Sequence, residues 1–342
     1  MTTGTPMPAA PHRRPGTGLA CLVAAGLLWG TGGLTGSLLG RSSGLSALSV
    51  AAYRLAAGGA LIIVFLILTG RRWPAGRAAW TRVAGIAGLA AVFQSCYFTA
   101  VSLTSVSLAT LVTIGSAPVL VLAAERVRGR RADRLAVWAA GLALTGLGLL
   151  AGLPSGGFPE TTVLASAGLA VLAGAGFATL TLISARPVAG LDDLTATGFG
   201  FALGGLILLP VAAATGGIGF TPDPAALGLL AALGTAPTAV AYTLYFRGLR
   251  TAPAGTAALL SLLEPLTGTL LAALILGDRL GPSGIAGAVI LATALVLAAV
   301  AGGPGNRLRS SRESMTAVMM FPPGDGPGGR GPAAPRRPRI GS

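Results

Sequence analysis

The sequence predicts an all-α polytopic membrane protein whose ten transmembrane helices form two inverted five-helix repeats. Three observations predict this fold class. Apolar residues make up 53% of the 342 residues and charged residues only 10%, whereas a soluble domain has about 25% charged residues. The chain contains ten long apolar runs, and most of its arginines lie in alternate gaps between those runs or in the tails.

Each apolar run meets or approaches the length of about 20 residues that a helix needs to cross a bilayer. The first run is longer than the 7–15 apolar residues of a signal peptide, so we expect a retained helix. Only a few Ser and Thr residues separate the third and fourth runs, which leaves a count of nine as the alternative. In order, the predicted spans are 19–39, 45–68, 83–103, 106–124, 135–153, 163–183, 194–214, 225–246, 254–276 and 281–301.

The arginines decide between the two counts. All 24 basic residues are arginines, and with ten spans the clusters in the gaps and tails fall on one side of the membrane. The other side receives only Arg41 and Arg279. Cytoplasmic loops show this excess of positive charge, so we expect ten spans with both termini in the cytoplasm. Nine spans would place the later clusters on the opposite side.

The spans divide the chain into four parts. We expect an N-terminal cytoplasmic tail at 1–17, one repeat at 18–153, a second repeat at 161–301 and a C-terminal tail at 303–342. The last tail is rich in Gly, Pro and Arg, a composition that forms no packed core, so we expect a disordered, solvated segment. Contact of its arginines with anionic lipid is the alternative.

The two halves of the sequence repeat each other at a spacing of roughly 147 residues. The pair Gly58-Gly59 aligns with Gly204-Gly205, Tyr97-Phe98 aligns with Tyr245-Phe246, and Pro118 aligns with Pro265. Because each copy contains an odd number of spans, the second copy must enter the membrane from the opposite side. Inverted repeats of this kind are typical of secondary transporters.

The repeated segments resemble the EamA-type branch of the drug/metabolite transporter superfamily. The resemblance rests on LLWGTGG at 27–33, YRLAAGGALI at 53–62, and the runs 93–121 and 255–297, and it covers about 19–301. It implies ten helices, a place in the bacterial inner membrane, and export of a small metabolite or drug.

Two features depart from that family pattern. After Pro118 the sequence reads LVLAAERVRGRRADR instead of an apolar run that ends in Gly-Glu-Arg, so we expect the fourth helix to end early. Asp278 stands at the end of the ninth span, where Glu is more usual.

The composition argues against several other functions. The basic residues lie in gaps and tails rather than on one binding face, which disfavours a nucleic-acid partner. One His and two Cys leave no site for a metal, and we expect no cofactor. The chain has no Walker A sequence, and it lacks intramembrane His, Asp pairs or a triad for an enzyme. We read the glycines of GFGFALGG, together with Gly32/Gly36 and Gly148/Gly152, as close helix packing and not as a nucleotide fingerprint.

Two ionisable residues lie well inside apolar runs, Arg54 in the second span and Glu264 in the ninth. A charge at the bilayer centre costs about 2.5–3.5 kcal/mol on insertion scales. Arg54 must therefore find an acceptor, whereas Glu264 can become neutral by taking up a proton. One hypothesis is a structural ion pair between the two helices. The other places Glu264 in the translocation pathway, as a proton site or a partner for a cationic substrate.

Other polar and aromatic residues occur at similar depth, and they either line a cavity or join helices by hydrogen bonds. Pro118 and Pro265 remove a backbone donor from the fourth and ninth spans, and we expect a kink at each. The pathway candidates besides Arg54 and Glu264 are Trp29, Gln94, Tyr97, Thr113, Ser116, Tyr245 and Ser261.

Together these features predict a secondary transporter that exports a small-molecule substrate by alternating access, with proton entry as one source of energy. The alternative is a channel or a membrane scaffold that transports nothing. The expected partners are the substrate and the lipid bilayer, and the sequence leaves a homodimer open.

Overall fold

The computed structural model describes residues 16–129, 133–152, 158–277 and 279–303. Within these ranges the chain forms helices and no extended strands. In the described part of the chain, ten helices are long and apolar enough to cross a membrane, which confirms the predicted fold class. The expected disordered tail falls almost wholly on 304–342. That segment, most of the N-terminal tail and Asp278 lie outside the described residues.

Each copy supplies five spans, and two spans of the second copy are interrupted. The first copy contains α1 (Thr17–Ser43), α2 (Ala47–Leu68), α3 (Arg77–Leu103), α4 (Val106–Val127) and α5 (Arg134–Ala151). The second begins with α6 (Glu160–Ser184) and α7 (Asp193–Gly216). Its third span consists of α8 (Pro224–Gly234), the π-helix η1 (Thr235–Val240) and α9 (Ala241–Gly248). Its fourth consists of α10 (Ala254–Leu260), α11 (Leu263–Leu271) and the π-helix η2 (Ala272–Leu276), and α12 (Pro282–Ala301) is the fifth.

The short break between the third and fourth spans is real. The side chain of Ser105 accepts a hydrogen bond from the backbone N–H of Leu108 at 3.2 Å, which caps the start of α4. Ser46 caps α2 in the same way. A capped start satisfies a backbone donor that would otherwise have no partner, so α3 and α4 form as separate helices.

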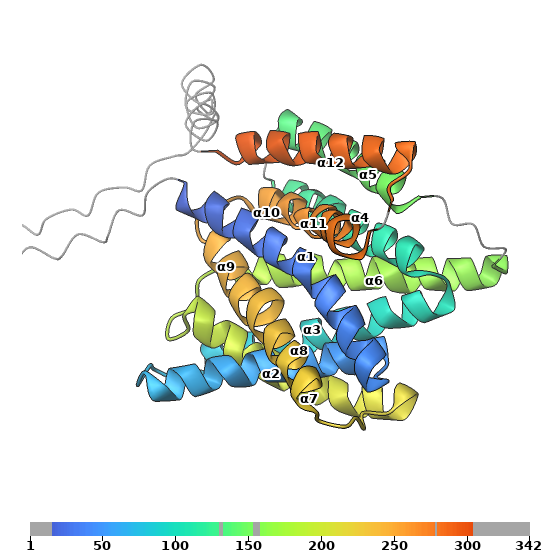
Figure 1. Cartoon of the computed structure of the whole chain (residues 1–342). Coiled ribbons are helices and arrows are strands. Elements are labelled where there is room, and N and C mark those ends of the chain that lie inside the picture. The colour runs from blue at the N-terminus through green and yellow to red at the C-terminus, as the bar shows by residue number, and fades with distance from the viewer. Residues whose placement is uncertain (1–15, 130–132, 153–157, 278, 304–342) are drawn as a thin grey trace, which may run out of the picture. The chain divides into compact units, whose positions relative to one another are not determined.

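The two sets of five spans pack in matching ways, as expected of two copies of one unit. The second spans pack against each other (α2 with α7), and so do the fifth spans (α5 with α12). The first span of each copy packs against the third and fourth spans of the other copy: α1 contacts α9 and α11, and α6 contacts α3 and α4. Figure 1 shows the α2–α7 and α5–α12 pairs on opposite sides of the bundle.

Glycines allow the backbones of α2 and α7 to touch. A Cβ atom on Gly59 would lie 2.2 Å from the backbone nitrogen of Ala202, and one on Gly205 would lie 2.4 Å from that of Ala56. Both distances are far below van der Waals contact, so a side chain at either position forces the helices apart. The glycines that align between the repeats thus form the contact between them.

Glycines also bring the backbones of α5 and α12 into contact, but not at every glycine that was predicted to pack closely. A Cβ atom on Gly146 would lie 2.6 Å from the backbone nitrogen of Leu291. By contrast, a Cβ atom on Gly148 or Gly152 would have nothing within 4 Å, so the expected packing role of those two residues is wrong. Gly148 faces away from the partner helix, and Gly152, with φ 74°, ends α5.

The fourth span is longer than expected. α4 continues to Val127, so the expectation that it ends early is wrong. Glu and Arg favour helix, and Glu125 and Arg126 therefore extend the helix beyond the apolar run. It stops just before Gly129, whose φ of 78° is the left-handed conformation that commonly ends helices.

Candidate functional site

The ninth span is broken near its middle, between α10 and α11. Pro265 has no N–H to donate to the carbonyl of Ser261. The backbone N–H of Glu264 donates to that carbonyl instead, at 3.0 Å. The break therefore places Glu264 in the first turn of α11.

A cavity of about 500 Å³ lies beside this break. A volume of this size accommodates a small organic molecule. The cavity extends from Glu264 to Arg41 and Leu45, which lie where α1 ends and α2 begins. The polar residues that line it are Ser37, Arg41, Arg54, Gln94, Tyr97, Thr110, Thr113, Tyr242, Ser261 and Glu264.

Arg54 and Glu264 bring one charge of each sign to this cavity. The two side chains interact electrostatically, yet in the described part of the chain they form no ion pair within 4.0 Å. Tyr242 interacts electrostatically with both. Each charged group is partly exposed and so keeps the capacity to bind a ligand.

An aromatic cluster around Trp29 forms one wall of the cavity. The ring centroid of Trp29 lies 4.8 Å from that of Tyr242, 5.0 Å from that of Tyr245 and 6.0 Å from that of Phe177. Edge and tilted contacts of this kind fix ring orientation. The buried Nε1 of Trp29 and Oγ1 of Thr113 have no hydrogen-bond partner among the described residues.

The structure brings seven of the nine predicted pathway residues to the cavity and leaves two outside it. Those that line it are Trp29, Arg54, Gln94, Tyr97, Thr113, Ser261 and Glu264. Tyr245 lies behind Trp29, where its hydroxyl hydrogen-bonds Thr181 at 2.8 Å. Ser116 packs against Gly174 of α6, and its hydroxyl donates to the carbonyl of Thr113 at 3.1 Å.

The two prolines have different surroundings. α4 runs through Pro118 as one helix. Pro265 follows the break in the ninth span and lines a second cavity of about 310 Å³, between α1, α4, α5 and α11. Trp29 and Glu264 line both cavities. Glu264 thus stands where the two spaces meet.

Sequence reasoning missed Tyr242, Thr110 and Phe177 as cavity residues. Tyr242 precedes the candidate Tyr245 by three residues, so the two lie near one face of the helix. That spacing could have identified Tyr242 as a candidate. Phe177 sits in an apolar run in which nothing distinguishes it from a core residue. Among the described residues, no three His, Cys, Asp or Glu side chains come together to hold a metal.

The end of the bundle opposite the cavity mouth is tightly closed. Tyr245, Phe246 and Leu259 are each 1% exposed. Beyond them, Arg250 forms an ion pair with Asp193, in which its Nε donates to Oδ1 at 2.8 Å. This closed end is the arginine-rich end, where α3 and α7 begin and α6 and α9 end.

Comparisons with known proteins give a family match, a related transporter and a solved structure of similar fold. The model of the EamA-like transporter family matches residues 16–152 and again residues 164–300. The chain is 31% identical over 288 residues to the uncharacterized transporter YwfM of Bacillus subtilis (strain 168), covering 83% of this chain and 93% of that protein. A crystal structure of a protein 20% identical in sequence superposes with a TM-score of 0.70, over 85% of this chain and 99% of that one, which shows a shared fold.

Proposed function

Because the chain belongs to the EamA-like transporter family, it is a multi-pass membrane transporter, and we propose that it exports small organic solutes by secondary active transport. In this proposal it lies in the bacterial inner membrane with both termini in the cytoplasm. The excess of arginine at one end of the bundle supports that orientation.

The observation that carries the proposal is the asymmetry of the cavity. It reaches the end of the bundle near Arg41, while the arginine-rich end is closed by buried aromatic and leucine side chains. With the arginine-rich end in the cytoplasm, this conformation is open to the outside. Alternating access needs a second conformation in which the closed end opens, and inverted repeats allow such an exchange.

Glu264 is the group that we assign to energy coupling. Among the described residues it is the only acid that lines the cavity, and it lies deep within a membrane span, where a neutral, protonated form is favoured over a bare charge. A carboxyl that binds either a proton or a cationic group, but not both, links their movements in opposite directions. Proton entry then drives solute exit.

Arg54 extends the proposal to the class of solute. It offers a fixed positive charge in the same cavity as Glu264, and the aromatic cluster around Trp29 offers an apolar wall. A solute with an anionic group, a cationic group and an apolar part satisfies all three features. The volume of about 500 Å³ limits it to a small molecule.

The test uses the full chain in proteoliposomes that contain a pH-sensitive dye, with a panel of small zwitterions, cations and anions as solutes. We expect one or more solutes to move in the direction opposite to protons that flow down an imposed gradient, and the dye to report that proton movement. Glu264→Gln should abolish this proton-linked movement while the protein stays folded. The matched control is Glu160→Gln, which changes an exposed acid at the start of α6.

Counterflow separates the transporter from a channel or a scaffold. A transporter shows faster uptake of labelled solute when unlabelled solute is inside the vesicle, a channel shows no such stimulation, and a scaffold moves nothing. Unchanged proton-linked transport in Glu264→Gln would refute the coupling role, and absence of counterflow for every solute in the panel would refute the transporter mechanism.

A further inference from the structure

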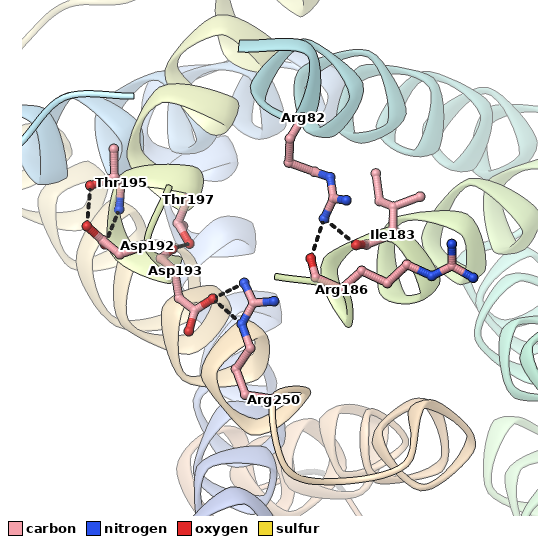
Figure 2. A network of polar contacts seen from close by, with 8 residues as sticks. All are labelled: Arg82, Ile183, Arg186, Asp192, Asp193, Thr195, Thr197 and Arg250. Atoms are coloured by element: carbon pink, nitrogen blue, oxygen red, sulfur yellow. Dashed lines mark hydrogen bonds and ion pairs between the residues drawn. The ribbon is translucent and has the colours of Figure 1, made fainter. Parts of the chain in front are cut away.

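Four segments meet at the arginine-rich end and enclose a small pocket. Arg82 comes from the start of α3, Ser184 from the end of α6, and Arg250 from the turn after α9. The loop after α6 contributes Arg186, and the first turn of α7 contributes Ala196. Figure 2 shows the Arg82 and Arg250 side chains approaching from opposite sides, while that of Arg186 extends away from Arg250.

Positive charge at this pocket exceeds the negative charge that neutralises it. Arg250 pairs with Asp193, but within the described part of the chain Arg82 donates only to the uncharged carbonyls of Ile183 and Arg186. Arg82 is repelled by both Arg250 and Arg186. The start of α7 adds the positive end of a helix dipole.

The other nearby acid is already engaged. Asp192 caps α7, where one carboxylate oxygen accepts the backbone N–H of Thr195 at 2.9 Å and the other accepts its hydroxyl at 2.8 Å. Three arginines therefore line the pocket, and among the described residues Asp193 is the one carboxylate paired with any of them.

Two hydrogen-bond donors that face this pocket have no acceptor. The Oγ of Ser184, a residue only 3% exposed, and Nη1 of Arg250 are buried and have no partner among the described residues. A buried donor without a partner is costly. A small anion, which only accepts hydrogen bonds, would satisfy both groups and offset the excess positive charge.

The size of the pocket limits the ligand. The enclosed space is about 10 Å³, which is close to the minimum for one water-sized particle. A monatomic anion fits after a small movement of the flexible arginine side chains, whereas a polyatomic anion such as sulfate is too large. We propose that the pocket between Arg82, Ser184 and Arg250 binds one small monovalent anion of the chloride type. By joining α3, α6 and the end of α9, the anion stabilises the closed conformation of this end.

The test measures thermal unfolding of the full chain in detergent as sodium chloride, bromide, gluconate or sulfate is added at constant ionic strength. We expect chloride and bromide to raise the melting temperature by a few degrees in a saturable manner. Gluconate and sulfate should produce no saturable rise. Crystals grown with bromide should show an anomalous scattering peak between Ser184 and Arg250.

Two variants make the test specific. Ser184→Ala removes one donor and leaves the Arg250–Asp193 pair intact, so the chloride concentration at half-saturation should rise at least about tenfold. Arg247→Gln removes an exposed positive charge from the same helix end and should leave the response unchanged. Equal responses to chloride and sulfate, an unchanged midpoint in Ser184→Ala, or a bromide map without a peak would each mean that the pocket holds only water, and would overturn the proposal.

Discussion

The fourth spans of the two copies carry a proline at equivalent positions, but they have different structures. α4 passes through Pro118 without interruption, whereas the ninth span breaks into α10 and α11 just before Pro265. Both prolines remove the same backbone donor, so proline alone does not cause the break. The residues just before the prolines both line the cavity but differ in kind: Ala117 is apolar and 2% exposed, whereas Glu264 is acidic and partly exposed.

The comparison shows that equivalent positions in the two copies can differ: one carries an apolar side chain, and the other carries an ionisable carboxyl. A carboxyl within the membrane needs water or a polar partner, and Glu264 faces a cavity that Arg54 and Tyr242 also line. In α4 the equivalent position bears a methyl group and needs neither. Two substitutions test this difference, and a third tests a contact that the two copies share.

The largest expected effect is on transport. Pro265→Ala restores a backbone N–H that can bond to the carbonyl of Ser261, so the ninth span can become continuous and move Glu264. We expect transport to fall at least about tenfold, equivalent to ~1.4 kcal/mol in the barrier. Pro118→Ala is the matched control and should transport like the parent protein. If both variants transport at the parental rate, the break has no part in the mechanism.

The second substitution transfers the acid to the other copy. Ala117→Glu places a carboxyl before Pro118, where α4 is continuous and packed, and should destabilise the protein by about 2.5–3.5 kcal/mol. Thermal melts in detergent measure this loss. Combined with Glu264→Ala, the transferred acid should not restore proton-linked transport. Recovery of transport in the double variant would show that the two copies are interchangeable at this position.

The smallest expected effect concerns a contact that the two copies share. Gly146→Ala puts a methyl group 2.6 Å from the backbone of α12, and overpacking of this kind costs about 1–3 kcal/mol. Gly148→Ala, on the same helix with nothing within 4 Å, should be neutral or slightly stabilising because Ala favours helix. Chemical or thermal unfolding compares the two, and similar losses at both positions would contradict the assigned packing.

Much of the fold could be predicted because the positions of charged and apolar residues along the chain indicate where the membrane spans begin and end. The alternation of arginines predicts ten spans, and the aligned pairs Gly58-Gly59 and Gly204-Gly205 indicate the repeat whose second spans touch. The extent of α4 could not be predicted from hydropathy, because the charged residues that extend it form helix beyond the apolar run.

The residues that line the cavity were only partly predictable, because the polarity of a residue does not show which way its side chain faces on a membrane helix. Glu264 and Arg54 stand out as charges among apolar residues, but Ser116 and Thr113 look alike in the sequence. The structure turns Ser116 toward α6 and Thr113 toward the cavity. Tyr242 was missed because an aromatic residue in an apolar run has the same appearance whether it faces lipid, core or cavity.

The glycine contacts also limit how the gene can be divided. Each half of the chain would expose a groove of bare backbone on its second and fifth helices, complementary to the same groove on the other half. Two separately made halves would therefore find in each other their best-fitting surface, and a half made alone would have to present these grooves to lipid.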